Sequence, residues 1–192
     1  MGTYNLAIAT KVLYESHLTL FTTKTLRDLF SVDLPQATFF FLLSRLTRGN
    51  ILQKIERDKY LLAGGSVHDF SLANFLYEPS YVSLEMALNF YGILPQFPYE
   101  ISSVTPKKPT TKTLNGKTYR FVRLKQTLFW GYDAAPGFLI AHPEKALLDL
   151  LYLQSKGLSR VHMDELDLSK LDRARFEIYA NRFPALKGMA LP

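Results

Sequence analysis

The 192-residue chain contains no cysteine, which excludes disulfide bridges and thiolate metal sites. Its four histidines, His17, His68, His142 and His162, are scattered and never fall at i, i+4 spacing, so we expect no metal centre. No apolar run approaches the roughly 18 residues of a membrane-spanning helix, and residues 1–20 lack the features of a signal peptide. These absences predict a cytoplasmic protein with no membrane partner, metal or cofactor.

Motifs for catalysis are also missing. The chain has no phosphate-binding loop of the Gly-x-x-x-x-Gly-Lys type and no nucleophile elbow. Glu144 and Lys145 resemble a fragment of a nuclease carboxylate-lysine set, but the preceding strands offer no second acid to share a metal. We therefore expect that the protein is not an enzyme.

Positive charge is absent from one part of the chain and concentrated in two others. The net charge is +6 and the pI about 9.4. Residues 66–100 contain no lysine or arginine and four acids, whereas residues 1–65 contain eight cations and five acids, and residues 101–132 contain seven cations and no acid. Such a split basic distribution is typical of a nucleic-acid-binding protein.

The stretch from Phe21 to Leu62 predicts a winged helix-turn-helix. A helix capped at Thr22 or Thr23 is followed by turn residues and by a second helix from about Pro35 to Arg48, which Gly49-Asn50 ends. The apolar residues of the second helix have the spacing of one buried face: Phe39, Leu42, Leu43 and Leu46. After Gly49 the period becomes alternating, which predicts a two-stranded wing that turns at residues 57–59.

This pattern suggests that the second helix enters a DNA major groove while the wing lies along phosphates. The expected DNA-binding residues are Gln36, Thr38, Arg45, Arg48, Lys54, Arg57 and Lys59. Phe40 and Phe41 can contact thymine methyl groups on such a surface or can pack against a neighbouring domain. Winged helices also serve as protein-docking modules that bind no DNA, and this alternative stays open.

A second domain should begin after the flexible Ala63–Ser66 segment, which gives an α+β protein with domains at residues 1–66 and 67–192. The second domain should contain strands at 100–105 and 118–124, a hairpin at Asn115-Gly116, strands at 128–132 and 138–141, and helices at 143–153 and 169–183. In the last helix Leu171, Ala174, Ile178 and Tyr179 should face inward. A possible second basic surface comprises Lys107, Lys108, Lys112, Lys117, Arg120 and Arg123. The alternative is a charged sheet edge that discourages aggregation.

Three segments together carry a resemblance to a known family. They are Leu46–Ile55 with Tyr60, Tyr81–Gly92 with its Ser-Leu-Glu-Met-Ala-Leu motif, and Ile140–Asp149 with its Pro-Glu-Lys-Ala-Leu-Leu-Asp motif. In this order and at this separation, covering nearly the whole chain, they resemble the AbiEi-like antitoxins of type IV toxin-antitoxin systems.

The resemblance implies a transcriptional autorepressor that binds inverted repeats of double-stranded DNA in its own promoter. It also implies that the second domain counteracts a nucleotidyltransferase-like toxin, as a functional partner that need not form a stable complex. The family pattern maps DNA contacts onto Thr38, Arg45, Arg48, Lys54, Arg57 and Lys59. The chain departs from this pattern at Phe39-Phe40-Phe41, which moves the expected base-reading surface toward Gln36 and Thr38.

Overall fold

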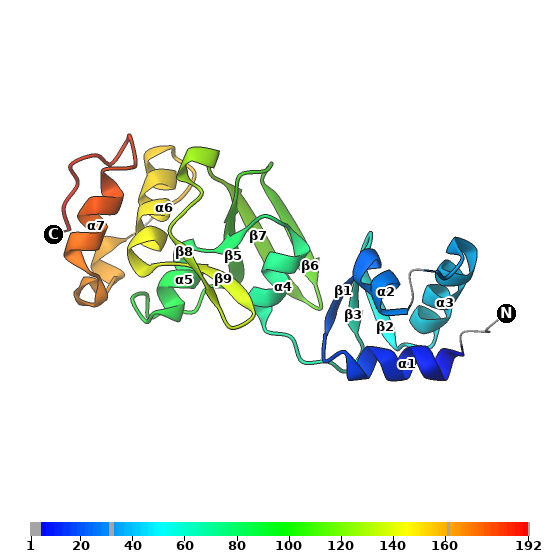
Figure 1. Cartoon of the computed structure of the whole chain (residues 1–192). Coiled ribbons are helices and arrows are strands. Elements are labelled where there is room, and N and C mark those ends of the chain that lie inside the picture. Colours follow the sequence, from blue (N-terminus) through cyan, green and yellow to red (C-terminus); the bar gives the residue numbers. More distant parts are fainter. Residues whose placement is uncertain (1–4, 31–32, 161, 192) are drawn as a thin grey trace. The chain divides into compact units, whose positions relative to one another are not determined.

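A computed structural model describes residues 5–30, 33–160 and 162–191 of the chain (Figure 1). The fold class is α+β, as predicted, with helices and two separate β-sheets. The chain divides into two compact units between Val67 and His68, one residue after the boundary expected from the sequence. Each unit contains one of the two sheets.

The N-terminal unit combines helices with a small antiparallel sheet. Its elements are α1 (Leu6–Glu15), β1 (Leu20–Thr22), α2 (Thr23–Phe30), α3 (Gln36–Arg48), β2 (Leu52–Glu56) and β3 (Lys59–Leu62). The strand order is β1-β3-β2, in which Phe21 pairs with Tyr60 and Lys54 pairs with the same tyrosine from the other side. The order of α2, α3, β2 and β3 is the order predicted from the sequence, and β1 is an addition that the sequence pattern did not indicate.

Local signals explain where the helices of this unit begin and end. The Thr22 hydroxyl accepts a hydrogen bond from the Thr25 amide at 3.0 Å and thereby caps α2. Pro35 precedes α3, and Gly49 and Asn50 end it, with Asn50 in the left-handed conformation at φ 51°. The predicted apolar face of α3 is buried in one core with residues of α1, α2 and the sheet.

The second unit is built on a mixed sheet. Its elements are α4 (Asp69–Leu76), β4 (Tyr81–Val82), α5 (Leu84–Phe90), β5 (Glu100–Thr105), β6 (Thr110–Leu114), β7 (Lys117–Arg123), η1 (Gln126–Leu128), β8 (Tyr132–Ala135), β9 (Phe138–Ala141), α6 (Pro143–Ser155), η2 (Met163–Glu165), η3 (Leu168–Lys170) and α7 (Arg173–Ala180). The strand order is β6-β7-β5-β4-β9-β8, in which β5 pairs with β7 and β4 with β9 in parallel and the other pairs are antiparallel.

Helices cover both faces of this sheet. Helix α4 covers one face, where Tyr77, the residue that follows this helix, contacts the ring of Phe121. Helix α5 covers the other face, where Ser102 of β5 donates a hydrogen bond at 2.9 Å to the carbonyl of Ser83, the residue that precedes α5. Helix α6 is buried along nearly its whole length, as its leucine content predicts. It is the centre of the core of the second unit.

Two predictions for the second unit are wrong. The expected strand at 128–132 is absent: the 3-10 turn η1 ends at Leu128, residues 129–131 form no strand, and β8 begins only at Tyr132 and occupies residues assigned to a turn. Helix α7 begins at Arg173 because Asp172 caps it by accepting from the Arg175 amide at 3.0 Å. Ala174 and Ile178 are exposed, the latter at 64%, whereas Phe176 and Ala180 are buried. Burying the large phenyl ring removes more apolar area from water, which decides the orientation of the helix.

Candidate nucleic-acid interface

The exposed face of α3 carries the polar residues that the sequence pattern assigned to DNA. Gln36 and Thr38 are exposed in its first turn, and Arg45 and Arg48 are exposed near its last. The helix has 13 residues and is therefore about 20 Å long, and it contains no acidic residue. It is long enough to lie across a major groove, which is about 12 Å wide.

The two arginines at the end of α3 differ from other cations of the unit in their surroundings. Within the described residues, neither Arg45 nor Arg48 has a carboxylate within ion-pair distance. By contrast, Arg27 lies over the ring of Phe39 at 4.9 Å and donates a hydrogen bond to the Leu34 carbonyl at 3.1 Å. Arg45 and Arg48 therefore keep their hydrogen-bond donors available for an anionic partner.

The wing cations are not equivalent. Lys54 on β2 is exposed, and Arg57 is 96% exposed, with its Nε atom 3.7 Å from a carboxylate oxygen of Asp58. Asp58 also accepts a hydrogen bond from the Thr23 hydroxyl at 3.1 Å, which ties the turn to the start of α2. Lys59 is half-buried. Of the three predicted wing contacts, Lys54 and Arg57 are therefore the accessible ones.

A cavity joins the end of α3 to the wing. It has a volume of about 460 Å³ and is lined by Thr47, Asn50, Leu52, Gln53, Lys54 and Ala63. The structure therefore brings Lys54 to the C-terminal end of α3, where Arg48 is located. Gln36 lies at the opposite end of the same helix, about 18 Å away at 1.5 Å per residue.

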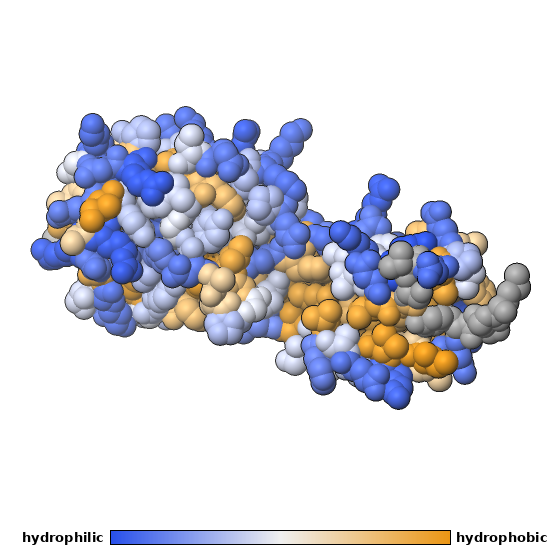
Figure 2. Space-filling view, in the orientation of Figure 1, coloured by the Kyte–Doolittle hydropathy of each residue, from blue (hydrophilic) through white to orange (hydrophobic). Residues whose placement is uncertain are grey.

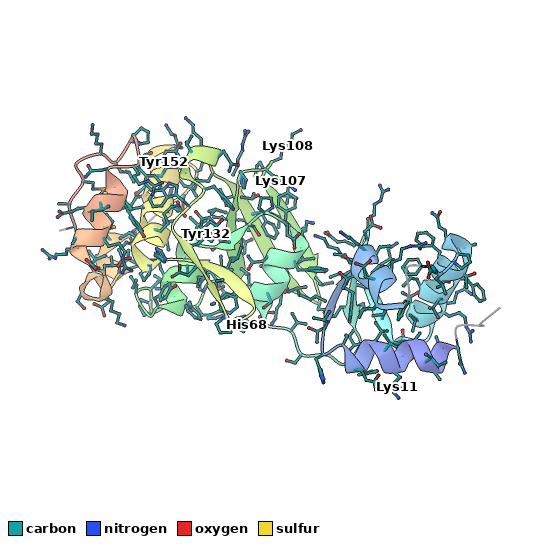
Figure 3. The ribbon with its side chains drawn as sticks, viewed as in Figure 1. Lys11, His68, Lys107, Lys108, Tyr132 and Tyr152 are labelled. Atoms are coloured by element: carbon teal, nitrogen blue, oxygen red, sulfur yellow. The ribbon has the colours of Figure 1, made fainter. Side chains whose placement is uncertain are left out.

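The possible second basic surface is largely engaged within its own unit. Lys107 and Lys112 donate to backbone carbonyls of Glu78 and Leu76, at 2.5 and 2.8 Å, and both ammonium groups lie over the ring of Tyr77. Figure 3 shows Lys107 and Lys108 at the connection between β5 and β6. These local contacts hold the connection against the end of α4.

The hairpin cations that follow are also paired. Lys117 lies 2.6 Å from a carboxylate oxygen of Asp69, and the Arg120 Nε atom lies 3.7 Å from Glu100. Lys108 and Arg123 are exposed at different ends of the stretch. Because β6 is an edge strand and carries Lys112, these contacts favour the charged-edge interpretation over a continuous anion-binding surface.

The core of the second unit contains a polar cluster, which consists of Tyr81, Ser83, Lys145 and Asp149. The Lys145 ammonium contacts Asp149 and donates to the Tyr81 hydroxyl at 2.8 Å, while Tyr81 and Ser83 donate to Asp149 at 3.0 and 2.9 Å. Ser83 precedes α5 as predicted, but its side chain makes no capping bond because it turns to Asp149. The sequence indicated the Lys145–Asp149 pair by its spacing and gave no signal for the two hydroxyl partners.

Burial dominates the electrostatics of this cluster. Both charged side chains are 0% exposed. Burial lowers the pKa of Lys145 while the Asp149 charge opposes the change, and burial raises the pKa of Asp149 while Lys145 opposes it. A substrate has no access to groups so completely covered, so we assign the cluster to the stability of the unit.

Comparisons with known proteins assign no family to the chain: a scan against protein-family models and a search of curated proteins each find no match. Among the described residues no three His, Asp or Glu side chains are grouped as metal ligands, and no helix there combines the length and apolar character needed to cross a membrane. The function is therefore inferred from the chemistry of the surfaces.

Proposed function

We propose that the protein is a DNA-binding transcriptional repressor whose N-terminal unit binds double-stranded DNA through α3 and the wing formed by β2 and β3. The observation that carries the proposal is the exposed face of α3, which has no acidic residue and ends in two arginines without carboxylate partners in the described chain. Lys54 and Arg57 extend this basic surface along the wing. Cations placed on both sides of a helix end fit the phosphates that border a major groove.

The resemblance of three sequence segments to AbiEi-like antitoxins supports a second role. On this basis we propose that the second unit counteracts a nucleotidyltransferase-like toxin encoded beside the protein, and that the repressor acts on inverted repeats in its own promoter. The two activities would be exerted in the cytoplasm. The motif Pro143–Asp149 lies on α6, where Lys145 and Asp149 are core residues, so this part of the resemblance bears on fold stability rather than on toxin contact.

Salt dependence provides the first test of DNA binding. The affinity of the protein for the promoter duplex should fall steeply as salt rises, because each neutralised phosphate contributes close to one unit of log-log slope. Arg45→Ala and Arg48→Ala should each weaken binding, by about 1–3 kcal/mol if the residue contacts a base edge. Both variants should unfold at the wild-type midpoint because the side chains are exposed.

A charge-matched variant makes this test specific. Lys11 lies on α1 (Figure 3) in an exposed pair with Glu15, 3.6 Å apart, and Lys11→Ala removes the same charge as either arginine substitution. We expect Lys11→Ala to leave affinity nearly unchanged. Equal losses in all three variants would show that net charge alone, and not the α3 face, determines binding.

The alternative is a protein-interaction module of a phage-defence system that does not bind DNA. Its support is the apolar surface of the N-terminal unit, where Figure 2 shows hydrophobic residues around α1. Ile8 of this helix is 53% exposed. The absence of duplex binding at low salt would favour this function. In that case, the survival of cells that express the adjacent toxin would be compared with and without the full-length protein.

A further inference from the structure

One large apolar side chain lies within the polar face of α3. Phe41 is 65% exposed, and it lies one helical turn after Ala37 and one turn before Arg45. The phenylalanines before it have other roles. Phe39 is fully buried in the core, and the ring of Phe40 packs edge-on against that of Phe39 with centroids 5.4 Å apart. Of the three phenylalanine rings, that of Phe41 therefore contributes least to the packing of the N-terminal unit.

The neighbours of Phe41 along the exposed face of the helix are small or positively charged. Ala37 and Ser44, at i−4 and i+3, are small, while Arg45 and Arg48, at i+4 and i+7, are long and charged. The exposed ring is therefore bordered, toward the C-terminal end of α3, by two cations. An exposed ring beside two cations fits a partner that offers both an apolar group and negative charge.

The charge around Phe41 favours a polyanion over a second copy of the chain. In an antiparallel symmetric contact between two α3 helices centred on Phe41, Arg45 and Arg48 would face the N-terminal end of α3 in the other copy, where Arg45 would lie opposite Ala37. No acidic residue on α3 is available to pair with these arginines, and covering a cation without a partner opposes such a contact. A DNA groove, by contrast, is lined with phosphates that attract both arginines.

We propose that Phe41 is a specificity-determining residue that reads thymine in the major groove. The C5-methyl group of thymine is the apolar group that base edges present there, and it is a suitable contact for a phenyl ring. The inference rests on the proposed DNA binding and deepens it. It assigns an A·T base pair, with the thymine facing Phe41, to the position in the binding site that the middle of α3 covers.

The proposal can be tested by removing the C5-methyl groups of thymine from a duplex. This test does not require that the binding site is mapped first. The duplex that precedes the protein's own reading frame is amplified once with thymidine triphosphate and once with deoxyuridine triphosphate. The two products differ only in the C5-methyl groups, because uracil keeps the pairing and the charge of thymine. Affinities of the full-length wild type, Phe41→Ala and Phe40→Ala are measured for both duplexes at a salt concentration where an unrelated duplex binds weakly.

We expect the wild type to bind the uracil duplex about fourfold more weakly for each methyl group that it contacts. Phe41→Ala should bind both duplexes equally, with roughly the affinity of the wild type for the uracil duplex. Phe40→Ala, the matched control, should keep the thymine preference. Phe41→Ala should also retain the wild-type unfolding midpoint, since most of its ring is outside the core.

Three results would overturn the inference. Equal binding of both duplexes by the wild type would refute the thymine contact while leaving DNA binding intact, whereas no binding to either duplex would refute the proposed function as well. A thymine preference that persists in Phe41→Ala would assign the methyl effect to other residues or to DNA shape. If that persistence is accompanied by a change from dimer to monomer in sedimentation, the ring is covered by a second copy of the chain.

Discussion

Replacing Lys145 with methionine should destabilise the second unit by about 3–5 kcal/mol, because it leaves the carboxylate of Asp149 buried without its cation. Methionine preserves most of the length and the apolar stem of the side chain, so the packing against the rings of Trp130, Tyr81 and Phe183 is largely retained. The loss of stability would therefore report the charge rather than a cavity.

A companion substitution separates the charge pair from its hydrogen bonds. Asp149→Asn keeps a carbonyl oxygen as acceptor for the hydroxyls of Tyr81 and Ser83 while it removes the negative charge. Each single variant leaves one charge unpaired, whereas the double variant Lys145→Met with Asp149→Asn leaves none. The destabilisation of the double variant should therefore be smaller, by about 2 kcal/mol, than the sum of the destabilisations of the two single variants.

Urea denaturation followed by the fluorescence of Trp130 measures these effects. Trp130 is the one tryptophan of the chain and lies with its ring 5.1 Å from the Lys145 ammonium, so its emission reports the second unit alone. Costs below about 1 kcal/mol for both single variants, with additive effects in the double variant, would refute the assignment of the pair as a coupled buried element.

The pH dependence supplies an independent check on the same variant. In Lys145→Met, burial raises the pKa of Asp149 with no lysine to oppose it. A carboxyl group whose pKa is raised by folding contributes stability that is fully present below the ordinary aspartate pKa. This contribution is lost as pH rises through the raised pKa. The destabilisation relative to the wild type should thus be smaller at pH 5 than at pH 8. A destabilisation that is independent of pH would contradict a buried, titrating carboxyl group.

Three further predictions concern the N-terminal unit and the boundary between the units. Lys54→Ala should reduce the log-log salt slope of duplex binding by about one unit and leave the unfolding midpoint unchanged. Phe39→Ala should cost about 3–5 kcal/mol in urea denaturation followed by circular dichroism, because its ring is fully buried, and a cost below about 1 kcal/mol would contradict the core assignment. A fragment of residues 67–192 should show the folded emission of Trp130, fail to bind the promoter duplex, and still protect cells from the adjacent toxin. Protection by residues 1–66 instead would place the antitoxin activity in the first unit.

The sequence predicted best those elements whose signals are local. Helix α3 was predictable because its apolar residues repeat at helical spacing between a proline and a glycine, and the hairpin of β6 and β7 because Asn115 and Gly116 adopt the positive φ angles, 50° and 77°, that its tight turn needs. The exposure of Arg45 and Arg48 follows from the same helical period.

Elements that depend on distant partners were not predictable in this way. Strand β1 has three residues and exists because it pairs with β3, some forty residues later in the chain. The contacts of Lys107 and Lys112 with carbonyl groups at the end of α4 likewise result from the tertiary fold. The amino-acid composition does not reveal these contacts, and for that reason the two lysines were predicted as part of a partner-binding surface. Ser83 has the residue type of a helix cap, but a buried carboxylate attracts its hydroxyl more strongly.

The strand order of the second unit has a consequence for how the chain folds as it is synthesised. All pairings of β1, β2 and β3 are made within the first 62 residues, so the N-terminal unit can fold as soon as it leaves the ribosome. Strand β4, by contrast, lies in the middle of its sheet but pairs on one side with β9, where Val82 meets Ile140. Until that later strand and α6 are made, β4 is an open edge and Asp149 is not yet present to accept from Tyr81 and Ser83. We therefore expect nascent chains to contain a folded first unit before the second unit can form, and a chain that stops short of residue 138 to be prone to aggregation through its unfinished sheet.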